Sequence, residues 1–114
     1  MTTLQDVQSL VAAFLDATNE FDVDAALTLF ARDAVIDDPS TGETFDGQRG
    51  VRDYVELFFV GYNTVSRLLS VAPLDDGRSR ARVDFTGDFG HEIGRLDLAV
   101  DDDGRIIRID ADLE

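Results

Sequence analysis

The first half of the chain carries hydrophobic residues at helical spacing. Over residues 3–18, apolar side chains recur every three or four positions and polar residues fill the gaps, which predicts a helix with one buried face. Thr3 precedes Asp6 by three residues, a spacing that favours a capping box at the start of that helix. A short second helix is predicted after Asp22, and a third over residues 48–60, because their apolar residues follow the same spacing.

The second half alternates hydrophobic and polar residues, as strands with one buried face do. Four such strands are predicted, at residues 64–74, 78–89, 93–100 and 105–113, after a short strand at residues 34–37. Asp-Gly pairs at 76–77 and 103–104 separate neighbouring strands and are strong hairpin signals. Helices followed by an antiparallel meander predict an α+β fold. The 114 residues fit a single domain, residues 1–114.

The alternation divides the predicted sheet into an apolar face and a charged face. The apolar face is assigned Ala81, Val83, Phe85, Leu96, Leu98, Val100, Ile107, Ile109, Ala111 and Leu113. We expect the helices to cover that face, and the interleaved Arg and Asp of the other face to form cross-strand ion pairs, open to solvent or to a second subunit. The face of residues 78–89 is the most sensitive assignment, because a shift of one residue in register turns a strand over.

Composition narrows the possible functions. The chain has 24 acidic and 10 basic residues, a formal net charge of −14, and all of its basic residues are Arg. Such a charge repels nucleic acid and anionic membrane surfaces, so neither is an expected partner. The preference for Arg over Lys and Asp over Glu fits a GC-rich genome as well as adaptation to high intracellular salt.

Further function classes are excluded by what the sequence lacks. There is no Cys, and His91 is the single His, so thiol chemistry and zinc sites with two His ligands are excluded, and no metal is expected. The first residues have neither the basic segment nor the apolar core of a signal peptide. No apolar run is long enough to span a bilayer, and we therefore expect a cytoplasmic protein.

Residues 29–39, LFARDAVIDDP, together with the third helix and the meander, resemble the nuclear-transport-factor-two-like (NTF2-like) superfamily. Within it, the chain resembles the ketosteroid isomerase and SnoaL-like polyketide cyclase branch, over its whole length and most closely from Phe14 to Tyr54. The resemblance implies a curved, mainly antiparallel sheet that forms a cone with three helices around an apolar pocket. It further implies a small apolar ligand, no cofactor, and a homodimer formed through the sheet.

By this resemblance, Asp38 occupies the position of the general base of the isomerases, which removes a proton from a carbon next to a carbonyl. The isomerases stabilise the resulting oxyanion with a Tyr and a protonated Asp, but Phe14 and Leu96 stand at those positions here. Because loss of one such donor costs roughly 3–4 kcal/mol of barrier, we do not expect steroid isomerisation. Tyr54, on the apolar side of the third helix, is the best remaining donor.

Other residues complete the candidate site. The predicted pocket lining is Phe14, Phe30, Phe58, Val83, Phe85, Leu96, Leu98 and Ile109, with Asp38 at the wall or mouth. Tyr62, Asn63 and His91 are weaker catalytic candidates. Asp38 has a purely structural alternative, because Asp before Pro commonly starts a turn.

Two other functions remain open at this point. One is a non-catalytic small-molecule-binding or assembly module of the same fold, since fold does not fix function. The other is an enzyme similar to the limonene epoxide hydrolases, whose Arg-x-Asp motif Arg82-Val83-Asp84 resembles. In that comparison Ile36, Asp38 and Ala111 stand where those enzymes carry Tyr, Asn and Asp, and Arg82 and Asp84 would have to point into the pocket.

Overall fold

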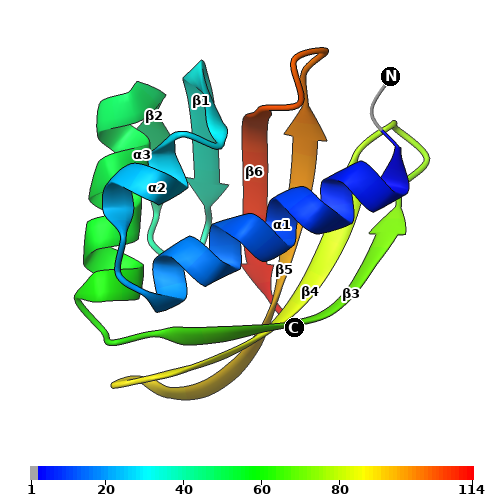
Figure 1. Cartoon of the computed structure of the whole chain (residues 1–114). Coiled ribbons are helices and arrows are strands. Elements are labelled where there is room, and N and C mark those ends of the chain that lie inside the picture. Colours follow the sequence, from blue (N-terminus) through cyan, green and yellow to red (C-terminus); the bar gives the residue numbers. More distant parts are fainter. Residues whose placement is uncertain (1–2) are drawn as a thin grey trace.

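The computed structural model describes residues 3–114 as a curved sheet with helices packed on one side (Figure 1). The helices are α1 (Leu4–Asn19), α2 (Val23–Leu27) and α3 (Gly47–Val55), and α3 continues into a π-helical turn, η1 (Glu56–Val60). The strands are β1 (Phe30–Asp38), β2 (Glu43–Asp46), β3 (Val65–Pro73), β4 (Ser79–Gly87), β5 (Gly90–Val100) and β6 (Ile106–Leu113). No helix among these residues is long and apolar enough to cross a membrane.

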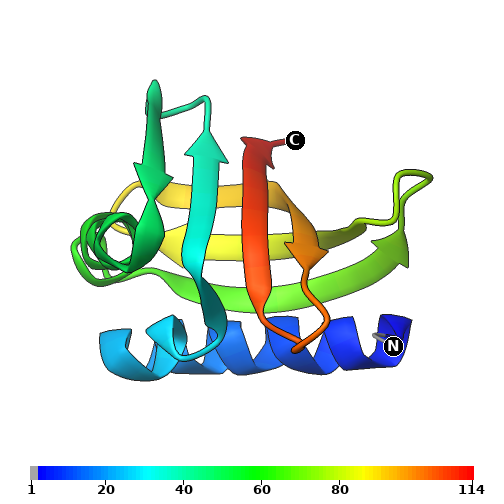
Figure 2. The same ribbon diagram turned by 90° about the horizontal axis from the view of Figure 1, so that it is seen from above.

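All strands belong to one six-stranded sheet in the order β2-β1-β6-β5-β4-β3. Neighbours pair antiparallel, except that β1 pairs parallel with β6. The sheet is strongly twisted, so that β3 and β4 run across the direction of β1 and β6 (Figure 2). The predicted α+β architecture, a curved and mainly antiparallel sheet packed on three helices, is confirmed, and the sheet remains open.

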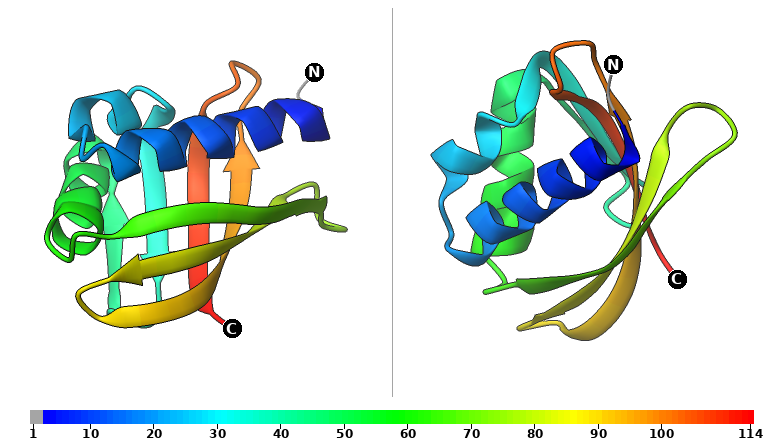
Figure 3. Two further views of the ribbon diagram at one scale, coloured as in Figure 1. Left: turned by 60° about the horizontal axis from the view of Figure 1, so that its bottom comes forward. Right: turned by 45° about the vertical axis from the view of Figure 1, so that its right-hand side comes forward.

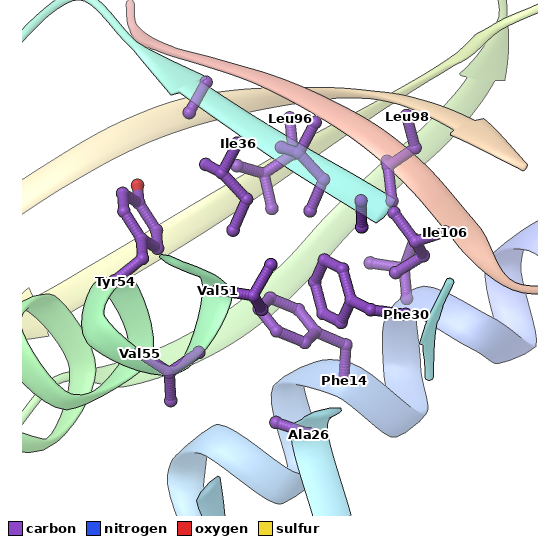
Figure 4. Packing of buried hydrophobic residues seen from close by; sticks show 14 of the residues in the cluster. Phe14, Ala26, Phe30, Ile36, Val51, Tyr54, Val55, Leu96, Leu98 and Ile106 are labelled. Carbon is purple, nitrogen blue, oxygen red and sulfur yellow. The ribbon is translucent and has the colours of Figure 1, made fainter. Parts of the chain in front are cut away.

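Helix α1 begins with the predicted capping box. The Thr3 hydroxyl accepts from the Asp6 backbone amide at 3.1 Å, and the Asp6 carboxylate accepts from the Thr3 amide at 3.0 Å. The helix then lies across the sheet and buries its apolar face there (Figure 3). Phe14 is central, because its ring meets the ring of Phe30 edge to face at a centroid distance of 5.5 Å (Figure 4). It meets the ring of Phe59 in the same way at 5.7 Å.

The meander has the predicted faces in β4 and β5. Ala81 and Val83 are fully buried on the helix side, so the strand whose register mattered most is oriented as expected. On the outer face, Arg80 donates two hydrogen bonds to Asp97, at 2.8 and 3.0 Å. Arg82 pairs with Glu114 in the same way, at 2.7 and 3.0 Å. These pairs confirm the predicted ion pairing on the charged face.

Several local predictions are wrong. The strand predicted at residues 34–37 spans Phe30–Asp38, and β2 was not predicted at all. The helix predicted over residues 48–60 is α-helical only to Val55. Ile107 is 40% exposed, whereas Ile106 is fully buried, because β6 has one extra residue at this point: Ile106 pairs with Val100 and Arg108 with Ala99, so Ile107 is left out of the pairing.

Candidate functional site

Asp38 lies at the end of β1, immediately before Pro39, and is 8% exposed. Its Oδ1 accepts hydrogen bonds from the backbone amide of Ser40 at 3.1 Å and from the Ser40 hydroxyl at 2.6 Å. Its Oδ2 accepts from the hydroxyl of Tyr54 at 2.7 Å. The carboxylate therefore closes a turn with one oxygen and accepts a hydrogen bond from a buried hydroxyl with the other.

Tyr54 reaches Asp38 from α3 and is also 8% exposed. Its ring packs against Phe45 and Phe58 at centroid distances of 5.1 and 5.0 Å, and its oxygen points away from Phe14 and Phe30 (Figure 4). Burial, the charge of Asp38 and the hydrogen bond to it raise the pKa of Tyr54 well above its ordinary value. Tyr54 is therefore protonated near neutrality and donates a hydrogen bond to Asp38.

This pair lies in the wall of a pocket of about 540 Å³. The pocket is lined by Asp38, Ser40, Thr41, Glu43, Tyr54, Phe58, Phe59, Tyr62, Thr64, Phe85, Phe89, Glu92, Leu96, Ala111, Asp112 and Leu113. Asp38, Tyr54 and Leu96 are among its buried members, whereas Tyr62 and Phe89 are each 44% exposed. The volume suits a small organic ligand.

The π-helical turn supplies two successive aromatic side chains to this pocket, Phe58 and Phe59. The wider turn is visible in the backbone, where the amide of Gly61 donates to the carbonyl of Glu56 and that of Thr64 to the carbonyl of Phe59, both at 2.8 Å. Single π-turns within helices occur frequently at functional sites.

The β4–β5 hairpin completes the mouth of the pocket. The amide of Asp88 donates to the backbone carbonyl of Tyr62 at 2.8 Å, and the ring of Phe89 meets that of Tyr62 at 6.0 Å. Gly87 permits this approach, because a Cβ there would lie 2.7 Å from the Tyr62 carbonyl oxygen.

The predicted lining residues fall into two groups. Phe58, Phe85 and Leu96 line the pocket together with Asp38 and Tyr54. The others lie in the hydrophobic core beneath it, because α1 fills that part of the concave face; they are Phe14, Phe30, Val83, Leu98 and Ile109.

The weaker candidates lie in different places. Tyr62 lines the pocket mouth, and the Asn63 side chain donates to Asp88 at 3.0 Å. His91 is exposed in β5, and its ring pairs with Asp84 on the outer face of the sheet. Within residues 3–114, no group of three or more His, Asp or Glu side chains is arranged to hold a metal ion.

Several lining residues were missed from sequence. Ser40, Thr41 and Glu43 belong to the turn into β2 and its first residue, which no periodicity signalled. The segment that resembles the epoxide hydrolase motif is not part of the site. Arg82 pairs with Glu114, and Asp84 with Arg67 at 3.2 Å, all outside the pocket lining.

Comparison with known proteins agrees with this fold. A family model described as a SnoaL-like domain matches residues 11–111. The chain therefore belongs to the SnoaL-like family. A search of the curated proteins finds no match.

Solved structures with the same fold include proteins of several kinds. One is a candidate polyketide cyclase from Sinorhizobium meliloti, with a TM-score of 0.82 and 23% identity, covering 96% of this chain and 99% of that one. A candidate ketosteroid isomerase from Kribbella flavida has a TM-score of 0.80 and 19% identity, covering 96% of this chain and 78% of that one. SalBIII, an epoxide hydrolase/cyclase-like enzyme in pyran ring formation in salinomycin, has a TM-score of 0.79 and 20% identity. The match covers 100% of this chain and 95% of that one. At these identities the likeness establishes the fold alone.

Proposed function

We propose that the protein binds a small, mainly apolar carbonyl compound in this pocket and that Asp38 transfers a proton on it. The observation that carries the proposal is a buried carboxylate in the wall of an aromatic pocket, fixed by hydrogen bonds from Tyr54 and Ser40. A general base must be held where a substrate can reach it, and this one is held by a strand end and a helix.

The hydrogen bonds leave Asp38 capacity to act. An ionised carboxylate has about four lone-pair positions, and three donor contacts from Tyr54 and Ser40 occupy Asp38. One position remains for a proton from the substrate.

The reaction balances as a reversible proton transfer. Asp38 takes a proton from the carbon next to the carbonyl, the C–H electron pair forms the carbon–carbon double bond, and the carbonyl oxygen becomes the enolate oxygen. Once Asp38 is neutral, it attracts the Tyr54 hydroxyl less strongly, and that O–H can turn to the enolate oxygen. Return of the proton to carbon restores the carboxylate.

Substitution of Asp38 tests the proposal. Exchange of the α-hydrogens of 2-tetralone for deuterium is followed by NMR in D₂O, with the wild-type protein, Asp38→Asn and Asp37→Asn. Asp37 is the matched control, because it loses the same charge one residue away, where it pairs with Arg108 on the outer face at 3.3 Å. We expect protein-dependent exchange to disappear in Asp38→Asn alone; equal exchange in all three would refute the role of Asp38.

A second candidate function is binding without catalysis. It is favoured by the same hydrogen bonds, since a carboxylate that closes a turn through Ser40 also has a structural reason to be present. Under this alternative, neither the wild-type protein nor the variants exchange protons, while 2-tetralone still binds.

A further inference from the structure

The hydroxyl groups of the pocket lining share one property: four of the five donate their hydrogen bond inside the protein. The Tyr54 and Ser40 hydroxyls donate to the Asp38 carboxylate, at 2.7 and 2.6 Å. The Thr41 hydroxyl donates to the Asp38 backbone carbonyl at 2.8 Å, and the Thr64 hydroxyl to the carbonyl of Phe58 at 2.6 Å. The fifth is the hydroxyl of Tyr62, at the exposed mouth. The side chains of the pocket therefore present acceptors far more than donors.

The charged groups that line the pocket are all negative. Besides Asp38 they are Glu43, Glu92 and Asp112, and no Arg is a lining residue. Asp112 is paired with Arg95 at 3.3 Å. Within residues 3–114, neither Glu43 nor Glu92 forms an ion pair, and both are exposed at the pocket edge. An anionic ligand would meet repulsion here and find almost no donor.

An aromatic ring stands beside one of these carboxylates, and further rings line the same pocket. Phe85 pairs across the β4–β5 ladder with Glu92, and Tyr62, Phe58 and Phe89 line the same pocket, with the rings of Tyr62 and Phe58 6.1 Å apart. Ring faces attract a cation, and carboxylates do so more strongly. The rings suit the apolar body of a ligand, and the carboxylates suit a positively charged end of the same ligand.

We propose that the ligand of this pocket is an apolar amine that carries its positive charge at neutral pH, with its hydrocarbon part among the aromatic rings and its ammonium group toward Glu43 or Glu92, the exposed carboxylates of the pocket edge. An ammonium group supplies three donors and a positive charge, which is what the lining lacks. The inference rests on the proposed function only in taking the pocket as the ligand site; with that function, the substrate class becomes an apolar ketone bearing a protonated amine.

Three ligands with one skeleton test the charge preference. Calorimetric titrations compare 2-(aminomethyl)naphthalene, 2-naphthalenemethanol and 2-naphthoate, which end in an ammonium, a hydroxyl and a carboxylate. We expect the ammonium ligand to bind at least tenfold more tightly than the alcohol, and the carboxylate to bind most weakly. Equal or tighter binding of the carboxylate, or no binding of any of the three at millimolar concentration, would overturn the inference.

The net charge of −14 attracts any cation. Two double variants distinguish this general attraction from the effect of the carboxylates at the pocket. Glu43→Gln/Glu92→Gln removes two charges at the pocket edge. Asp75→Asn/Asp102→Asn removes two charges at exposed turn positions outside the lining. We expect the first pair to weaken the ammonium ligand about tenfold and the alcohol less than twofold, and the second pair to change neither. Equal weakening by both pairs would assign the preference to net charge and refute the inference.

Proton exchange on 2-tetralone distinguishes failure of the inference from failure of the proposed function. Ammonium selectivity without exchange in the wild-type protein refutes catalysis and supports the inference. Exchange that depends on Asp38, together with preferred binding of 2-naphthoate, supports catalysis and refutes the inference.

Discussion

The hydroxyl of Tyr54 donates a hydrogen bond to Oδ2 of Asp38 at 2.7 Å, and both side chains are buried. One comes from a helix and the other from the end of a strand, 16 residues apart in sequence. The bond therefore links α3 to β1 and at the same time orients the carboxylate in the pocket wall. Stability and the proposed activity therefore depend on the same contact.

Removal of the Tyr54 hydroxyl tests the contribution of this bond to stability. Tyr54→Phe keeps the ring among Phe45 and Phe58 but leaves Oδ2 of Asp38 without its donor, so we expect a loss of about 1–3 kcal/mol in the free energy of unfolding. Denaturant titration measures it. Tyr62→Phe is the matched control, because Tyr62 is 44% exposed and its variant should be within about 0.5 kcal/mol of wild type. Equal effects of the two variants would contradict the importance of the buried bond.

The raised pKa of Tyr54 predicts a loss of stability in alkali. A Tyr whose pKa is higher in the folded than in the unfolded state contributes stability that is complete below the unfolded value of about 10. That contribution is lost as the pH rises through the folded value, because the unfolded chain releases the proton first. Absorbance at 295 nm measures ionisation of the protein's two Tyr residues, and we expect the part that is delayed beyond pH 10 to be absent from Tyr54→Phe. Complete ionisation of folded wild-type protein near pH 10 would contradict the prediction.

Substitutions of Phe14 and Phe89 are expected to have different effects, because Phe14 lies in the core and Phe89 at the pocket mouth. Phe14 is 1% exposed and packs on two other rings, so Phe14→Ala should cost about 3–5 kcal/mol of stability. Phe89 is 44% exposed at the pocket mouth, so Phe89→Ala should cost about 1 kcal/mol or less while weakening binding of 2-tetralone. Thermal unfolding and ligand titration of both variants measure this, and a mild effect of Phe14→Ala on stability would contradict its place in the core.

The sequence predicted the elements that bury one continuous face. The helical spacing around Phe14 and the alternation around Val83 each reflect a single apolar side. By contrast, β2 has one buried residue, Phe45, in four, which is too little for a period to be seen. Ile106 and Ile107 are adjacent and chemically identical, so only the pairing with β5 decides which is buried.

The site was predictable only to the level of its central residues. The resemblance predicts Asp38, and the apolar side of the third helix predicts Tyr54. Their hydrogen bond, however, depends on how α3 packs against β1. Phe14 is predicted to line the pocket because the resemblance places it at the donor-Tyr position of the isomerases. The sequence does not tell how deeply α1 fills the concave face, and Phe14 lies in the core. The turn residue Ser40 carries no hydrophobic pattern at all, and only the folded chain brings it to Asp38.

The charged outer face of the sheet leads to the last prediction, that two chains associate through it. We propose a two-fold homodimer, because a face with alternating rows of Arg and Asp is complementary to itself when rotated by half a turn. Arg80 and Asp97 are in the middle of that face, on β4 and β5. An interface of this kind is polar, and salt screens it. Sedimentation velocity should therefore show a dimer at low salt whose dissociation constant rises at 1 M NaCl.

Two double variants that leave the net charge unchanged locate the interface. Arg80→Ala/Asp97→Ala removes an ion pair of the outer face, whereas Arg52→Ala/Asp24→Ala removes one formed by α2 and α3 at 2.7 Å. Neither changes the net charge, so a general charge effect is absent from both. We expect the first to weaken the dimer at least tenfold and the second to leave it within twofold of wild type. A monomer at both low and high salt would refute the dimer, and a dimer weakened only by the helix pair would place the interface on the opposite side of the molecule.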